Sequence, residues 1–499
     1  MERDYTLFIP EFIAAGGAIA VIGAELVYPR IRKDYLAYLT AVIALAWGIA
    51  ALFYIGHTPG DFQGVIQTDN FTTFFRLLAA AIVFVISLLS AQYLRDRSRV
   101  AGEYYGLLLL AGCGMVYMAA AQELITAYIS LELLSFSLYI LVGFLKRDNL
   151  SSEASLKYIL LGAFSSAMFL YGMSIIYGVT GTTYYDGIAA GLAERSGDTD
   201  AAVIVGFMLI LAGVGFKVSA APFHMWAPDA YEGAPLPITA FLSTASKAAG
   251  FALILRLFTF PFLVDALEWR WAMAALSAIT MTAGNLIAIQ QTSMKRLIAY
   301  SSIGQVGYML VVIAAIGYGD ADTAKNASTG LLLHIAGYTV STLALFTALT
   351  AYYNRTGKDT IAGLRGLAET QPFLALVITA SLFSFAGLPF FAGFTTKIFM
   401  FQGSVTDGLL WLIGLAIANS FVSLYYYLMI VRQMYLFEPE AGMTRFRVNP
   451  VLATVGGALM LGVLAIGIYP GPLFEGAERA TDPLFGIGVD GGQGAARAP

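Results

Sequence analysis

Long apolar stretches follow one another along the whole chain, separated by short segments that contain most of the charged residues. Most of these stretches approach or exceed the roughly 20 residues that a helix needs to cross a bilayer. No polar block is long enough to form a soluble domain, so the pattern predicts an all-α polytopic membrane protein. Windows of low charge place fourteen helices at residues 6–27, 36–56, 70–93, 104–120, 121–145, 155–180, 201–227, 236–260, 271–290, 295–318, 327–353, 372–403, 408–437 and 448–470.

The composition supports a membrane environment. Hydrophobic residues make up 58% of the 499 residues and charged residues only 12%, against about 25% charged residues in an ordinary soluble domain. The mean hydropathy of +0.74 points the same way. A chain of this composition cannot bury its apolar residues in one aqueous fold, so lipid must be its main solvent.

Lysine and arginine residues are distributed unevenly between the two sets of connections. Seventeen lie at connections that follow odd-numbered helices and seven, including Arg256, on the opposite side; four fall inside apolar runs, namely Arg76, Lys217, Lys247 and Lys397. Short cytoplasmic loops are enriched in basic residues, so the odd-numbered connections are predicted to face the cytoplasm. With fourteen helices, both termini are then expected on the exterior side.

Four ionisable side chains within predicted helices are candidates for chemistry: Glu132, Lys217, Lys247 and Lys397. A charge at the centre of a spanning helix costs roughly 2.5–3.5 kcal/mol on insertion scales, so it indicates function by default. Burial favours the neutral form of a lysine and a nearby carboxylate favours the charged form, so such groups can hold or release a proton. The structural alternative is a static ion pair of Glu132 with Lys217, but buried pairs stabilise less well than apolar residues of equal volume.

Helix-breaking residues lie close to two of these lysines. Pro222 follows Lys217 in the seventh predicted helix, and Gly387 and Pro389 precede Lys397 in the twelfth. Backbone groups freed by a proline at membrane depth are tolerated only against protein or water. Paired interruptions in two halves of a chain are typical of inverted-repeat transporters. We therefore predict two inverted five-helix repeats, helices 4–8 and 9–13, with helices 7 and 12 broken.

This organisation divides the chain into five parts. They are three N-terminal helices, a first repeat, a second repeat, a last helix and a flexible tail, at residues 1–103, 104–260, 261–437, 438–470 and 471–499. The tail is rich in glycine, alanine and proline and shows no apolar periodicity, so we expect it to be extended or flexible.

Polar residues on the central helices could carry protons between the charged sites. His334 is favoured because the ordinary imidazole pKa of about 6.5 suits proton exchange, and Tyr300 and Ser301 are further candidates. His224 lies at the break of helix 7, where it could instead satisfy freed backbone groups. Each of these residues alone is also explained by a hydrogen bond between helices.

The sequence limits cofactor chemistry within this chain. Cys113 is the only cysteine, and His57, His224 and His334 are far apart, so we expect no iron–sulfur, haem or metal site. No Gly-rich dinucleotide fingerprint follows a convincing strand. The scattered basic residues do not indicate nucleic-acid binding. Any redox chemistry is expected in a partner.

Two long segments resemble signatures of a known family. Residues 216–235, FKVSAAPFHMWAPDAYEGAP, are similar to the signature of the antiporter-like membrane subunits of respiratory complex I. Residues 295–305, KRLIAYSSIGQ, resemble the helix 10 signature of the same family. Together with Glu132 and the break in helix 12, the resemblance covers nearly the whole chain.

Within this family the chain resembles the N-type branch. The M-type subunits and the D-type subunits of Mrp antiporters carry a glutamate on helix 12, where this chain has Lys397. The L-type subunits also have a lysine there but continue into a long lateral helix, whereas this chain ends soon after helix 14. The alternative function is a cation/proton antiporter subunit of the Mrp type.

The resemblance implies a proton-translocating subunit of an NADH:quinone oxidoreductase, a multi-pass protein of the bacterial inner membrane with periplasmic termini. It implies that Glu132 and Lys217 form a paired input site, that Lys247 is the central relay and that Lys397 is the output lysine. It also implies partners, namely other membrane subunits and a hydrophilic arm with NADH, FMN, iron–sulfur clusters and quinone. The chain itself would carry no redox centre.

Overall fold

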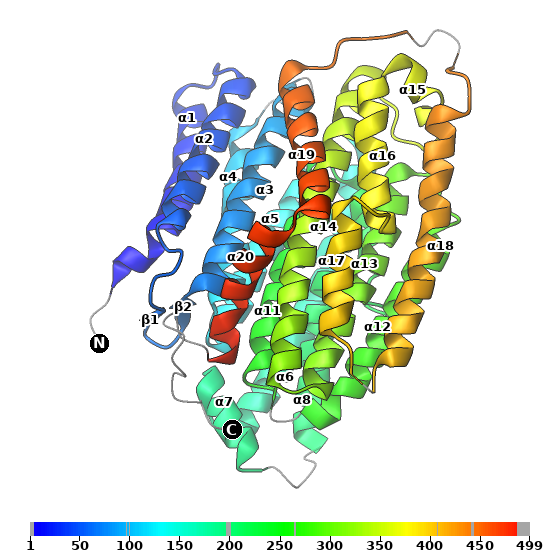
Figure 1. Ribbon diagram of the computed structural model, residues 1–499. Coiled ribbons are helices and arrows are strands. Elements are labelled where there is room, and N and C mark those ends of the chain that lie inside the picture. Colours follow the sequence, from blue (N-terminus) through cyan, green and yellow to red (C-terminus); the bar gives the residue numbers. More distant parts are fainter. Residues whose placement is uncertain are drawn as a thin grey trace.

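Long helices stand side by side through most of the molecule (Figure 1). The computed structural model describes residues 4–95, 97–98, 100–195, 201–263, 266–406, 408–440 and 444–486. Within these residues, thirteen helices are long and apolar enough to cross a membrane. The chain is therefore an all-α multi-pass membrane protein, as predicted.

The helices and strands, in chain order, are η1 (Tyr5–Phe8), α1 (Ile9–Val27), α2 (Lys33–Leu52), β1 (Gly60–Phe62), β2 (Ile66–Thr68), α3 (Asn70–Arg95), α4 (Gly102–Ala120), α5 (Leu124–Val142), α6 (Asn149–Thr180), α7 (Tyr185–Ala193), α8 (Ala201–Val218), α9 (Trp226–Gly233), α10 (Leu236–Phe241), the π-helical turn η2 (Leu242–Ser246), α11 (Lys247–Thr259), α12 (Ala266–Ala288), α13 (Met294–Tyr318), α14 (Ala321–Thr356), η4 (Ala362–Leu364), α15 (Leu367–Thr370), α16 (Pro372–Ala386), α17 (Ala392–Gly403), α18 (Leu410–Tyr435), α19 (Pro450–Ile468), α20 (Gly471–Thr481) and η5 (Asp482–Phe485).

The most enclosed helices occupy the middle of the bundle. The apolar windows of residues 236–259, 294–318 and 321–356 are 94–100% buried, compared with 39% for those of α1 and α2. In Figure 1, α1 and α2 form one edge and α18 the opposite edge. The inner helices carry Lys247, Tyr308 and His334, so these polar side chains are shielded from lipid by a layer of apolar helices.

The connections alternate between the two ends of the bundle. Figure 1 shows the β1–β2 hairpin and α7 at one end and α15 at the other. The hairpin and α7 follow the second and sixth predicted helices, and α15 follows the eleventh. Even-numbered and odd-numbered connections therefore lie at opposite ends, as an up-and-down membrane topology requires. Each hairpin strand has only three residues, too few for a sequence pattern to predict.

The first part of the predicted flexible tail is helical instead. Gly471–Thr481 form α20, which packs against α3 and α14. Thr481 Oγ1 lies 2.8 Å from Thr329 Oγ1, and Lys325 Nζ lies 2.8 Å from Asp482 Oδ1. One face of α20 is buried and carries small residues, a feature that the glycine- and proline-rich composition does not indicate. The prediction of an extended or flexible segment was therefore wrong for residues 471–481. Residues 487–499 of the predicted tail lie outside the described residues.

Two buried ion pairs join helices near the hairpin. Arg76 Nε of α3 lies 2.7 Å from Glu11 Oε1 of α1, and Arg256 Nη2 of α11 lies 2.7 Å from Asp69 Oδ2. Arg256 was expected in an exterior connection, but its side chain is only 4% exposed. It also donates to the Ala119 carbonyl, at the end of α4. Removing one partner of such a pair typically costs 3–5 kcal/mol, so these pairs fix the positions of α1, α3 and α11.

Candidate functional site

Lys217 lies in the last turn of α8, directly before the first helix break. The helix ends because Ser219 adopts a left-handed backbone conformation with φ of 66° and Pro222 has no backbone N–H. The freed carbonyls find new donors: Trp226 Nε1 donates to the Phe216 carbonyl at 2.9 Å. Lys217 itself is 1% exposed. The break therefore places a lysine side chain inside the bundle without leaving these backbone groups unpaired.

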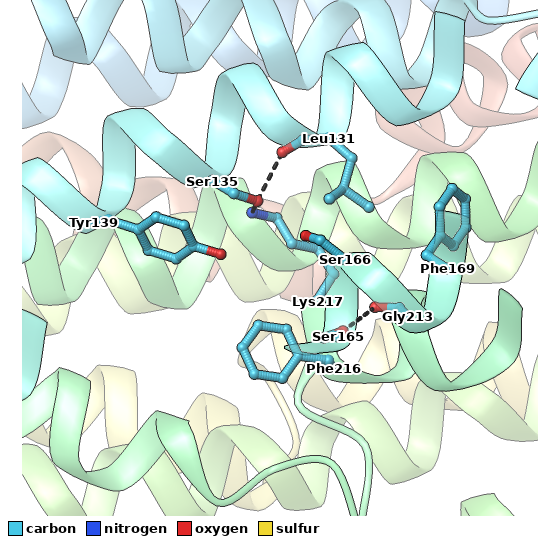
Figure 2. A pocket seen from close by; sticks show the side chains of 9 residues that line it. All are labelled: Leu131, Ser135, Tyr139, Ser165, Ser166, Phe169, Gly213, Phe216 and Lys217. Carbon is cyan, nitrogen blue, oxygen red and sulfur yellow. Dashed lines mark hydrogen bonds between the residues drawn. The ribbon is translucent and has the colours of Figure 1, made fainter. Parts of the chain in front are cut away.

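Hydroxyl groups surround the Lys217 amine. Lys217 Nζ donates to Ser135 Oγ at 2.9 Å, and Figure 2 shows the two side chains meeting with Ser166 and Tyr139 beside them. These residues line a small pocket with room for about one water molecule. Ser166 also donates a hydrogen bond to Glu132. The ion pairs of the described residues do not include Glu132 with Lys217; each of these two predicted input residues is hydrogen-bonded to a different serine of the same pocket.

Lys247 follows an irregular turn between α10 and α11. The π-helical turn η2 ends at Ser246, and such turns frequently mark functional sites. Lys247 is 2% exposed, and within the described part of the chain its Nζ has no hydrogen-bond partner. Helices α8 and α11 approach closely here: a Cβ on Gly250 would lie 2.5 Å from Val218 Cγ1 and 3.7 Å from Lys217 Cγ. Lys247 thus stands on the helix that packs beside Lys217.

The second break separates α16 from α17 and holds Lys397. Gly387, directly after α16, has φ of 79°, in the left-handed region that glycine tolerates. Lys397 Nζ donates to the Phe385 carbonyl at 2.9 Å, and Gln305 Nε2 donates to the same oxygen at 3.1 Å. The last carbonyls of a helix lack intrahelical donors and carry partial negative charge. The end of α16 therefore provides a polar anchor for the Lys397 ammonium group.

The relay candidates are divided between this region and other contacts. His334 Nδ1 lies 2.9 Å from Thr396 Oγ1, the residue before Lys397. Ser301 is hydrogen-bonded to the Tyr427 hydroxyl. Tyr300 is only half-buried and packs against apolar residues. His224 lies half-buried in the turn of the first break. Among the described side-chain contacts of these four residues, it is His334 that is hydrogen-bonded to the sequence neighbour of a predicted lysine.

Several contacts of the lysines were not identified from the sequence. Ser166 was missed because it belongs to a different helix from Glu132. The Phe385 carbonyl is a backbone group, which no residue pattern identifies. Tyr308, whose ring centroid lies 4.8 Å from Lys397 Nζ, could have been found, because it lies one turn after Gln305 on the same helix face.

These groups form a set of protonatable side chains within an apolar bundle. The ion pairs of the described residues include neither Lys247 nor Lys397, and the contacts around the lysines are hydroxyls, a carbonyl and aromatic rings. Buried ionisable groups next to helix breaks are typical of ion and proton pathways in membrane proteins. The fold and the site thus define the class of antiporter-like, proton-conducting membrane subunits.

Comparison with known proteins gives the particular family. The family model for "NADH:quinone oxidoreductase/Mrp antiporter, TM" matches residues 121–423, and the chain belongs to that family. NADH-quinone oxidoreductase subunit N of Trichlorobacter lovleyi is 38% identical over 480 residues, 96% of this chain and 97% of the relative. The same subunit of Moorella thermoacetica is 40% identical over 481 residues, 96% of this chain and 98% of the relative.

A solved structure shows the same architecture. A chain of respiratory complex I from Thermus thermophilus with bound aureothin superimposes with a TM-score of 0.78 and 29% identity, covering 94% of this chain and 99% of that chain. The similarity therefore extends over nearly the whole chain.

Proposed function

We propose that this chain is the N-type, proton-translocating membrane subunit of an NADH:quinone oxidoreductase. The near full-length similarity to subunit N relatives supports this function. The observation that carries the proton path is the presence of Lys217, Lys247 and Lys397, each at most 5% exposed, beside irregular helix segments. The chain spans a bacterial inner membrane many times, with both termini on the periplasmic side.

The proposed path begins at Glu132 and Lys217. Ser135 accepts a hydrogen bond from Lys217, Ser166 donates one to Glu132, and both serines line one pocket, so a proton taken up or released by Glu132 alters the hydrogen bonding within the pocket that holds the Lys217 amine. Lys247 is the central relay and Lys397 the output lysine. Quinone reduction in partner subunits drives the path, and NADH, FMN, the iron–sulfur clusters and quinone are bound by those partners. This chain supplies the acid–base groups, of which the three lysines are buried and Glu132 is partly buried.

The two breaks fit the proposed inverted repeats. Helices 4–8 of the prediction correspond to α4–α11 and helices 9–13 to α12–α18. Lys217 precedes its break and Lys397 follows its own. In both regions the half-helix before the break ends beside a lysine. Helix α8 carries Lys217 in its last turn, and the Phe385 carbonyl near the end of α16 accepts a hydrogen bond from Lys397.

The test replaces Lys217 by alanine in the native membrane, with Lys146→Ala as the matched control because Lys146 is exposed in a connection. The assembled complex is quantified first, and NADH-driven quinone reduction and vesicle acidification are then measured together. We expect Lys217→Ala to lower both rates by about tenfold or more, as for loss of a proton-transfer group. Unchanged rates in an assembled complex would contradict the proposed path.

The alternative, an Mrp-type cation/proton antiporter subunit, predicts a different result. Vesicles without NADH would then change their internal pH in response to a sodium gradient. Hard cations bind oxygen ligands, whereas the second break presents the Lys397 ammonium group. That repulsive charge favours proton translocation over cation exchange.

A further inference from the structure

Lys397 contacts an aromatic ring in addition to the Phe385 carbonyl. Its Nζ lies 4.8 Å from the centroid of the Tyr308 ring, within the range of a cation–π contact. Tyr308 is completely buried on α13. The ring presents its face to the ammonium group, and both residues are buried. Cation–π attraction is strongest when both partners are desolvated.

The ion pairs of the described residues do not join Lys397 to a carboxylate. Helices α13, α14, α16 and α19 pack against α17. Helices α16 and α19 contain no titratable residue. The titratable side chains near Lys397 include Tyr308 of α13 and His334 of α14, which is hydrogen-bonded to Thr396. Tyr338 of α14 and Tyr427 of α18 pack against the Phe385 ring. The protonated lysine is therefore stabilised by the Phe385 carbonyl and by the Tyr308 ring.

A buried amide cluster holds the Tyr308 ring in place. Asn285 Nδ2 of α12 donates to the Tyr308 hydroxyl at 2.9 Å, and the Tyr426 hydroxyl of α18 donates to Asn285 Oδ1 at 2.9 Å. Asn285 is 1% exposed. Asn419 adds a longer contact of 3.3 Å to the same amide. The hydroxyl end of Tyr308 is thus held by Asn285 of α12, which is itself held by α18, and the ring face is left for Lys397.

Lys247 has a similar neighbour. Its Nζ lies 5.8 Å from the centroid of the buried Tyr231 ring. The cation–π contacts of the described residues include Lys247 and Lys397 but not Lys217, the lysine that lies near Glu132. The two lysines that lack a carboxylate neighbour therefore each have a tyrosine ring instead.

We propose that Tyr308 is a positioning residue for proton transfer, whose ring face stabilises protonated Lys397 in place of a carboxylate while Asn285 fixes the ring. This inference rests on the proposed function, because it assigns a role in the same path. The ring of Tyr308, and not its hydroxyl, stabilises the charge of Lys397. Phenylalanine keeps the ring and loses only the hydrogen bond from Asn285, so it can replace Tyr308 as the stabilising group, whereas an aliphatic side chain cannot.

The experiment compares Tyr308→Phe, Tyr308→Leu and Tyr308→Met in the intact complex. NADH-driven acidification is measured over a range of pH around neutrality, after assembly has been checked. Without the ring the protonated lysine is less stable, so we expect the pH profile of the Leu and Met variants to move to lower pH by about one unit. The Phe variant is expected to keep most of the rate and the wild-type profile. Tyr105→Leu is the matched control, because Tyr105 is equally buried on α4.

Two results would overturn the inference. If Tyr308→Phe is as impaired as Tyr308→Leu, the hydroxyl is the essential group. If both aliphatic variants assemble and keep the wild-type pH profile, the ring does not stabilise the charge. Lys397→Met separates this failure from failure of the proposed function. Loss of acidification in Lys397→Met with a normal profile in the Tyr308 variants rejects only the role of Tyr308, whereas normal acidification in Lys397→Met rejects the proton path itself.

Discussion

The two helix breaks hold their lysines by different means. In the first break the Lys217 amine is bound by the side chain of Ser135, and Glu132 is linked to the same cavity through Ser166. In the second break Lys397 is bound by the main-chain carbonyl of Phe385. Side-chain hydroxyls rotate and can donate or accept, whereas a carbonyl at a helix end only accepts. The first site is therefore adjustable, and the second is fixed by the backbone.

The half-helices that follow the breaks are also anchored differently. After the first break, the short α9 carries Asp229 and Glu232, and Arg296 of α13 lies 2.7 Å and 2.9 Å from these carboxylates. After the second break, Lys397 is the only charged residue of α17, and that helix is held by close packing against its neighbours. Ion pairs near the bundle surface hold one half-helix, and backbone contacts hold the other.

The largest expected effect tests the backbone packing of the second break. A Cβ on Gly393 would lie 1.7 Å from the Ser384 carbonyl oxygen, whereas on Gly215 the nearest atom is Phe223 Cδ2 at 3.1 Å. We expect Gly393→Ala to prevent assembly, because a backbone clash forces α17 away from α16. Gly215→Ala should assemble, because a side chain can move aside. Native gel electrophoresis of the complex measures both, and equal assembly of the two variants would remove the contrast.

The next effect concerns the carboxylate that only the first site has. Glu132→Gln keeps the shape of the side chain and removes its charge and its ability to take up a proton. We expect vesicle acidification to fall by about a hundredfold, in the range for loss of an acid–base group. Glu103→Gln on the exposed start of α4 is the matched control. A Glu132→Gln complex that pumps as fast as this control would place the input site elsewhere.

A smaller effect is expected from the hydroxyl that binds Lys217. Ser135→Ala removes a hydrogen bond to a charged group, worth about 1.5–3 kcal/mol, so we expect a loss of about tenfold in acidification rate. Ser137→Ala is the matched control, because Ser137 lies on the same helix and bonds only to the Leu133 carbonyl among the described contacts. Equal rates in the two serine variants would show that Lys217 does not depend on this hydroxyl.

The smallest effect concerns the ion pairs of α9. Burial acts to raise the pKa of Asp229, but hydrogen bonds and charge from Lys157 and Arg296 outweigh it and hold that pKa below its ordinary value. A lowered carboxyl pKa contributes stability above the ordinary value, and this contribution is lost as the pH falls through the folded pKa. Solvent screening limits each pair to about 1 kcal/mol or less.

We therefore expect Arg296→Ala to lower the melting temperature of the complex slightly, and by the same amount at about pH 6 and about pH 8. Differential scanning fluorimetry in detergent measures the difference. Arg147→Ala, an exposed residue without an ion pair among those of the described residues, is the control. A destabilisation that disappears at about pH 6 would mean that Asp229 titrates near neutrality.

Most of the fold follows from the sequence. Hydrocarbon thickness sets the length of an apolar run, so the helices could be placed from composition windows alone. The two breaks were also predictable, because Pro222 and Gly387 interrupt their helices whatever their neighbours are. Glu132, Lys217, Lys247 and Lys397 stood out because a charge in a spanning helix is costly and therefore rare. The similarity of residues 216–235 and 295–305 to the signatures of the family indicated the family.

The tertiary structure decided which groups these charges meet. Ser166 reaches Glu132 from another helix, Tyr308 reaches Lys397 from α13, and the Phe385 carbonyl becomes available only because α16 ends there. Tertiary packing also buried Arg256 and made residues 471–481 helical. Hydropathy fixes how far a helix extends across the membrane but not how it rotates about its own axis. Rotation and contact partners depend on side-chain packing between helices, which is settled only when the whole bundle forms.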